Sequence, residues 1–148
     1  MRRALVLAAL VCGIALAIGC GARDEARQQI RMLDRGAFES DIQPILERRC
    51  ANPTCHGRED RPLSVYAPRC WREDPARIHM DEPLTASEIE HDYVASCVMA
   101  QIAAPNGSLF ARKALGERGG LYHGGGAVFD GPSDPEYRAL EAWARGER

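Results

Sequence analysis

Two cysteines and a histidine lie within seven residues of one another, in the segment Cys50-Ala-Asn-Pro-Thr-Cys55-His56. The chain has 148 residues, which is room for one domain. The two thiols of this segment can bond to each other, bond to a bound group, or hold a metal ion together with the imidazole. Each option fixes how the neighbouring segments pack around residues 50–56.

A cysteine pair followed directly by a histidine is typical of covalently attached haem. The thiols form thioethers to the haem vinyl groups, and the histidine becomes the proximal iron ligand. That motif usually has C-x-x-C-H spacing, whereas this chain has Cys50-x4-Cys55-His56. The residues Asn52-Pro53 are suited to the outward turn that the longer spacing requires.

Two alternatives use the same residues. One is a disulfide between Cys50 and Cys55, and the other is a zinc site made by two thiolates and His56. An oxidising compartment disfavours the zinc site because it disfavours free thiolates. The haem and disulfide interpretations therefore remain the main ones.

Residues 1–19 have the features of an export signal. Arg2 and Arg3 form a positive n-region, and residues 4–18 form an apolar h-region that is short for a membrane span. The segment ends Leu-Ala-Ile-Gly before Cys20, which resembles a bacterial lipobox and predicts a lipid on Cys20. The alternative is ordinary signal cleavage with Cys20 incidental. A lipid at Cys20 would tether an exported protein to a membrane surface, as a periplasmic or outer-membrane lipoprotein.

The charge of the remaining chain argues against a nucleic-acid partner. Without residues 1–19 it has 17 basic and 21 acidic residues, a net charge of -4, and no basic footprint. Residues 20–36 are charged and polar, and we expect them to be a spacer between the membrane and the domain. The domain is then residues 37–148.

Apolar periodicity predicts helices and no convincing strand, so the expected fold class is all-α. Residues 38–49 have apolar side chains at helical spacing, with Ser40 or Asp41 as the N-cap and Pro44 in the first turn. Residues 57–84 contain four prolines and are expected to be a long irregular insert.

The second half of the chain contains the clearest helix signals. Residues 85–104 begin with a capping box, Thr85-x-x-Glu88, and continue with apolar residues at the helical period. A short helix is expected over 108–115, followed by a glycine-rich loop. Ser133 or Asp134 is expected to cap the last helix.

These segments resemble a known family. The entry segment Phe38-x2-Asp-Ile-Gln-Pro-Ile-Leu-x3-Cys50-x4-Cys55-His56-Gly is similar to that of the c-type cytochrome domains of planctomycete and myxobacterial secreted proteins. The closing residues 105–146, with Ser-Leu-Phe, His-Gly-Gly-Gly and Asp-Pro-x-Tyr-x2-Leu-x2-Trp, resemble the family's second half. The resemblance implies a small cytochrome c-like helical domain with covalent haem c. The wider cysteine spacing and the long insert depart from the family pattern.

Family members often carry a Met-Pro distal ligand before the last helix, and this chain has none. His123 lies where that methionine would be, followed by three glycines that permit close backbone approach to a flat ring. We therefore expect His56 and His123 to be the two iron ligands. The alternatives for the distal position are Met80, Met99 and His79, and the other interpretation of His123 is a solvated loop residue. His91, between Glu90 and Asp92, is expected on a solvated helix face.

Cys70 and Cys97 are predicted to form a disulfide, because one lies in the irregular insert and the other on the core side of the 85–104 helix. No set of Ser, His and Asp residues has a nucleophile-elbow context, so we expect an electron carrier and not an enzyme. The hypothesis from the sequence is a lipid-anchored c-type cytochrome-like protein with one covalent haem and a redox protein partner. The alternative is a haem-free, disulfide-stabilised lipoprotein domain that binds a partner.

Overall fold

The computed structural model describes residues 30–104 and 106–147 as a small, mostly helical domain. The all-α prediction is confirmed: four helical segments carry the fold, and the strands of the described residues form only a two-residue hairpin. The helices, in chain order, are α2 (Arg35–Ala37), η1 (Phe38–Ile42), α3 (Gln43–Arg49), η2 (Pro75–Arg77), α4 (Ala86–Gln101), α5 (Leu109–Ala114), η3 (Gly116–Gly119) and α6 (Pro135–Arg145). The antiparallel strands are β1 (Ala103–Ala104) and β2 (Gly107–Ser108).

The first helix begins earlier than its apolar stripe indicates. Asp34 is its N-cap and accepts a hydrogen bond from Ala37 N, and α2, η1 and α3 then follow without a break. Ser40 and Asp41, the expected caps, lie inside the helix. Pro44 has no N–H to donate to the turn before it, and the π-helical turn Phe38–Ile42 absorbs this irregularity.

Residues 30–36, which the sequence placed in the spacer, pack on the domain. Leu33 is buried, its N–H donates to Cys97 Sγ at 3.5 Å, and its carbonyl accepts from Tyr93 OH at 2.5 Å. The Asp34 carbonyl accepts from Trp143 Nε1 at 2.8 Å. The polar composition of residues 30–36 does not predict this packing, because backbone groups, and not the polar side chains, make most of these contacts.

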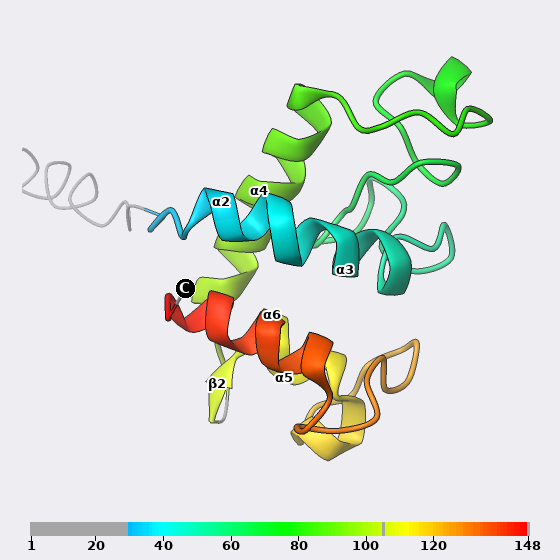
Figure 1. Ribbon diagram of the computed structural model, residues 1–148. Helices are drawn as coiled ribbons and strands as arrows, with labels where there is room; N and C mark the ends of the chain where they lie inside the picture. Colours follow the sequence, from blue (N-terminus) through cyan, green and yellow to red (C-terminus); the bar gives the residue numbers. More distant parts are fainter. Residues whose placement is uncertain (1–29, 105, 148) are drawn as a thin grey trace, which may run out of the picture.

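The core lies between the first helix, α4, α5 and α6. Figure 1 shows α2–α3 and α6 side by side, with α4 crossing behind them. Phe38 is fully buried, with its ring centroid 5.3 Å from that of Tyr93 and 5.4 Å from that of Trp143. Phe110 of α5 packs on the same indole at 5.9 Å.

The caps predicted for α4 and α6 are confirmed. Thr85 and Glu88 form a capping box at α4, and Asp134 caps α6. The structure adds Ser108 as the cap of α5. Within the described residues, no helix has both the length and the apolar content needed to cross a membrane.

The irregular insert over residues 57–84 is fixed to the N-terminal half of α4. Arg72 and Glu88 form an ion pair whose side chains are 0% and 1% exposed. The fully buried Asp92 accepts from Tyr66 N and from Gln43 Nε2, both at 2.9 Å, and so connects the insert, α4 and α3. These contacts hold the insert beside the end of α3, where the cysteine–histidine segment begins.

Candidate functional site

The segment from Cys50 to Gly57 is a compact turn at the end of α3. Asn52 Oδ1 accepts from Thr54 N at 2.9 Å and from Thr54 Oγ1 at 2.7 Å, which is an Asx-turn. His56 N then donates to the Cys50 carbonyl at 3.2 Å, so the chain closes on itself despite the longer spacing. A Cβ on Gly57 would overlap the Ala51 carbonyl oxygen, and only glycine fits there.

Arg61 holds this turn from outside. Its Nε donates to the Cys55 carbonyl at 2.9 Å, and its Nη2 donates to the Thr54 carbonyl at 3.3 Å. Val65 N donates to the His56 carbonyl at 2.8 Å. The insert therefore supplies side-chain and backbone donors that fix the position of His56.

The ring of His56 presents one nitrogen for a ligand bond. Its Nδ1 lies 2.6 Å from the Leu63 carbonyl oxygen, which can only accept, so Nδ1 carries the proton and Nε2 keeps its lone pair. Burial lowers the pKa of His56, and the nearby His123 lowers it further, against the opposing effect of the Leu63 bond. A neutral histidine oriented by a backbone carbonyl is typical of a metal-ligating histidine.

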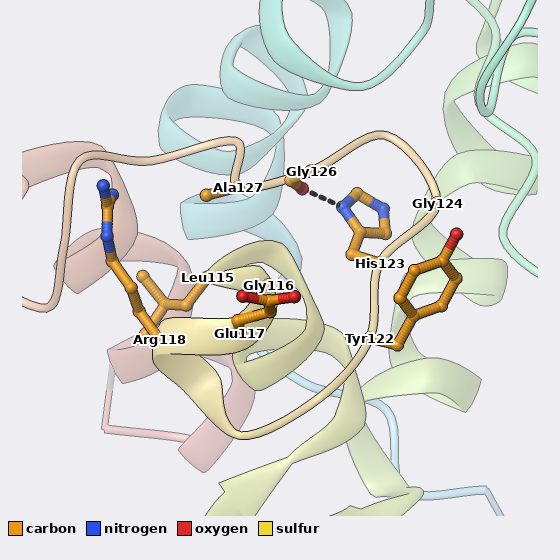
Figure 2. A pocket seen from close by; sticks show the side chains of 9 residues that line it. All are labelled: Leu115, Gly116, Glu117, Arg118, Tyr122, His123, Gly124, Gly126 and Ala127. Atoms are coloured by element: carbon orange, nitrogen blue, oxygen red, sulfur yellow. Dashed lines mark hydrogen bonds between the residues drawn. The ribbon is translucent and has the colours of Figure 1, made fainter.

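His123 has the same arrangement on a different part of the chain. Figure 2 shows it on the glycine-rich loop, with its Nδ1 bonded at 2.6 Å to the Gly126 carbonyl. Gly126 has a φ of +77°, a conformation that L side chains rarely adopt. The loop returns to α5 through Val128 N, which donates to the Ala114 carbonyl at 2.8 Å. The glycines thus let the backbone turn back and fix the imidazole.

The two histidines lie close together although 67 positions separate them in the sequence. Their ring centroids are 6.0 Å apart, and the ring planes differ by 15°. A metal ion bonded to one nitrogen of each ring at about 2.0 Å holds the ring centroids roughly 6 Å apart. The centroid separation of His56 and His123 is of this size, and their ring planes are near-parallel.

Two cavities meet at this pair of histidines. One, of about 80 Å³, is mostly apolar, and its walls include Cys50, Leu46, Met99 and Phe110. The other, of about 390 Å³, is more open and includes Cys55 and Arg61. Both are lined by His56, Pro62, Lys113 and His123.

The donor set fits haem c, and the space fits it only in part. Two imidazole nitrogens and two thiols on adjoining cavities are the groups that haem c requires, and apolar walls suit a porphyrin face. The 80 Å³ cavity is much smaller than a porphyrin. A haem held by these residues would extend across both cavities.

Cys50 and Cys55 are both free in the structure. Burial raises the pKa of Cys50 to about 12, with a smaller contribution from Cys55. The zinc alternative lacks its geometry, because no group of three His, Cys, Asp or Glu side chains gathers around one point anywhere in residues 30–104 and 106–147.

Cys70 and Cys97, which the sequence predicts to form a disulfide, are both free in the structure. Cys97 is fully buried, with its sulfur against Leu33 N at 3.5 Å. Cys70 closes a turn through its N–H, which donates to the Ala67 carbonyl at 3.1 Å. The insert docks on the N-terminal half of α4, near Glu88 and Asp92, whereas Cys97 lies further along the helix.

The other residues considered for the distal position are not in the same arrangement. Met99 lines the apolar cavity with the two histidines, and Met80 is 46% exposed on the insert. His79 is exposed on the insert and lines neither of the two cavities that meet at the histidine pair. Cys20 and the export signal lie outside the described residues.

His91 is only partly on a solvated face, because the insert covers part of its ring and leaves the side chain 37% exposed. Its ring packs edge-on against Tyr66 and Trp71, its Nε2 lies 3.3 Å from Ser64 Oγ, and its Nδ1 lies 3.1 Å from Asp92 Oδ1. Two charged neighbours in the sequence gave no sign of this, because the insert covers that side of α4. The carbonyls of Leu63 and Gly126 that accept from the rings of His56 and His123 were also missed, since backbone acceptors leave no mark in a sequence.

Comparisons with known proteins add no assignment: no protein-family model, no curated protein and no solved structure matches this chain.

Proposed function

We propose that the protein is a c-type cytochrome that carries one covalent haem and transfers electrons. The observation that supports this most strongly is the pair His56 and His123, near-parallel and 6.0 Å apart, with each Nδ1 on a backbone carbonyl. Cys50 and Cys55, on the two cavities that meet at this pair, are the thioether positions.

The protein's own residues supply orientation and a low-polarity environment. Leu63 and Gly126 fix the tautomer and rotation of the two imidazoles, so that both Nε2 atoms remain available. Leu46, Met99 and Phe110 exclude water from the inner side. When bound, the haem supplies one-electron redox chemistry, and two histidine ligands favour a lower potential than a methionine ligand does.

Cellular location is part of the same proposal. The export signal over residues 1–19 and the lipid at Cys20 would place the domain on a membrane surface, in the periplasm or on the outer membrane. A cytochrome in that position passes electrons to or from a redox protein partner.

The decisive experiment is maturation of the full chain in a host with haem ligation machinery, followed by a pyridine haemochrome spectrum and intact mass. We expect one haem per chain, bonded through both thiols. Cys55→Ser should lower the yield of attached haem and shift the haemochrome band to that of a single thioether. Cys70→Ser is the matched control, because Cys70 lies outside both cavities.

A mass equal to the polypeptide less the hydrogens of two disulfides would contradict the proposal. It would support the haem-free domain instead. The same conclusion would follow if Cys55→Ser left the attached haem and its spectrum unchanged.

A further inference from the structure

Exposed apolar side chains gather where the described chain begins. Ile30 and Met32 are 47% and 48% exposed, and Ile102 at the end of α4 is 42% exposed. They are three of the five large hydrophobic residues that the described part of the chain exposes. Ile30 and Ile102 share a shallow cavity of about 180 Å³ with Val98 and Gln101. We call Ile30, Val98 and Ile102, together with the exposed Met32 two positions after Ile30 in the chain, the apolar end.

Hydrogen bonds fix the backbone of the segment that carries Ile30 and Met32 on α4. Gln101 holds the backbone of Arg31 on both sides: its Oε1 accepts from Arg31 N at 2.7 Å, and its Nε2 donates to the Arg31 carbonyl at 3.0 Å. Leu33 continues this docking with its N–H on Cys97. The segment is therefore fixed on α4 while Ile30 and Met32 stay in solvent.

The distance to the expected lipid limits what can cover this surface. Ten positions separate Cys20 from Ile30. Ten residues span at most about 35 Å when fully extended. The residues between them are mostly polar or charged, so they are poorly suited to cover apolar side chains. A lipid on Cys20 therefore keeps the apolar end within about 35 Å of the bilayer.

We propose that the apolar end is a membrane-docking surface, and that its partner is the lipid bilayer to which Cys20 is anchored. This inference rests on the lipid attachment included in the proposed function. Docking there orients the molecule: in Figure 1, α2 and the C-terminus lie at one side, and the turn after α3 and the glycine-rich loop lie at the other. The histidine pair then faces away from the membrane, toward soluble redox partners.

Two methionines of nearly equal exposure allow the surface to be tested by comparing two residues of the same protein. Met32 is 48% exposed at the apolar end, and Met80 is 46% exposed on the insert. Lipidated protein is placed on the outer surface of phosphatidylethanolamine–phosphatidylglycerol vesicles and treated with chloramine-T. Peptide masses give the oxidation rate of each methionine. We expect Met32 to oxidise at least about threefold more slowly than Met80, because the interface excludes the oxidant.

Variants at Ile102 test whether the surface itself makes the contact. Ile102→Glu should bring the Met32 rate back to that of Met80 on vesicles, and Ile102→Leu should leave the protection intact. Cys20→Ala protein, exported without its lipid and studied in buffer, should oxidise both methionines at the same rate. Equal rates in lipidated wild-type protein on vesicles would overturn the proposal.

If something other than the bilayer covers the apolar end, the methionine oxidation rates change in a different way. Protection that persists in the Cys20→Ala protein in buffer would assign the cover to the chain's own N-terminal residues. Protection that disappears when protein is diluted in the bilayer would assign it to a second copy. Either result would overturn membrane docking. Intact mass of the same sample reports lipid and haem separately, so failure of the proposed function is distinguishable from failure of the docking surface.

Discussion

Arg72 and Glu88 form a two-bonded ion pair that is closed off from solvent. Arg72 Nε and Nη2 donate to the two carboxylate oxygens of Glu88 at 2.8 and 2.9 Å. The guanidinium also donates to the carbonyls of Glu82 and Pro83, and Glu88 accepts from Glu73 N and Thr85 N. The ion pair therefore attaches the insert to the capping box of α4.

Removing one partner of this pair should be strongly destabilising. Arg72→Met leaves the Glu88 carboxylate buried without its counter-charge, which costs about 3–5 kcal/mol of unfolding free energy. Urea unfolding followed by circular dichroism measures this loss. The control is Arg77→Met, because the Arg77–Glu82 pair is partly exposed and should contribute at most about 1 kcal/mol. Similar losses in both variants would contradict the structural role of Arg72.

The same pair predicts a pH dependence of stability. Burial acts to raise the pKa of Glu88, but the Arg72 bond and the backbone donors outweigh it and lower the pKa to about 2. A group with a lowered folded-state pKa contributes stability above its unfolded value of about 4.5 and loses it as the pH falls toward 2. The shift corresponds to roughly 3 kcal/mol.

The measurement is unfolding free energy between pH 6 and pH 2, for wild type and for Glu88→Gln. Burial raises the pKa of Asp92, which gives a contribution of opposite sign, so the difference between the two proteins isolates Glu88. We expect the wild type to lose more stability than Glu88→Gln over the range from about 4.5 to 2. Parallel curves would contradict this assignment.

Gly57→Ala should disrupt the turn that carries Cys55 and His56. Its Cβ would meet the Ala51 carbonyl, and a backbone group cannot move aside cheaply, so a loss of about 2 kcal/mol or more is expected. Gly124→Ala is the matched control, because nothing lies within 4 Å of a Cβ there. Thermal unfolding checks the difference. A Gly57→Ala protein as stable as Gly124→Ala would show that the turn differs from the one described.

His123→Ala tests the distal position in the haem-loaded protein. Loss of the second imidazole should convert a low-spin iron spectrum to a high-spin one and raise the potential, since one strong nitrogen ligand is removed. His79→Ala is the control, since His79 lines neither cavity at the histidine pair. An unchanged low-spin spectrum in His123→Ala would exclude His123 as the ligand and direct attention to Met99 on the same cavity.

Local sequence signals predict much of the fold. The caps at Thr85 and Asp134 lie within a few residues of the groups they satisfy, so sequence alone located them. The start of the first helix was missed because its cap, Asp34, precedes the apolar stripe. The partial cover of His91 was missed because its surroundings are made by Tyr66 and Trp71, residues about 20 to 25 positions away.

By itself, the sequence determined the helical class, the composition of the Cys50–His56 segment and His123 as its companion. These follow from periodicity, from motif spacing and from the glycines after His123. Only the tertiary structure decided that the two imidazoles lie 6.0 Å apart, that the four described cysteines are free, and that Leu63 and Gly126 orient the rings of His56 and His123. The physical reason is that these contacts join distant segments through backbone atoms and burial, which no local pattern of side chains encodes.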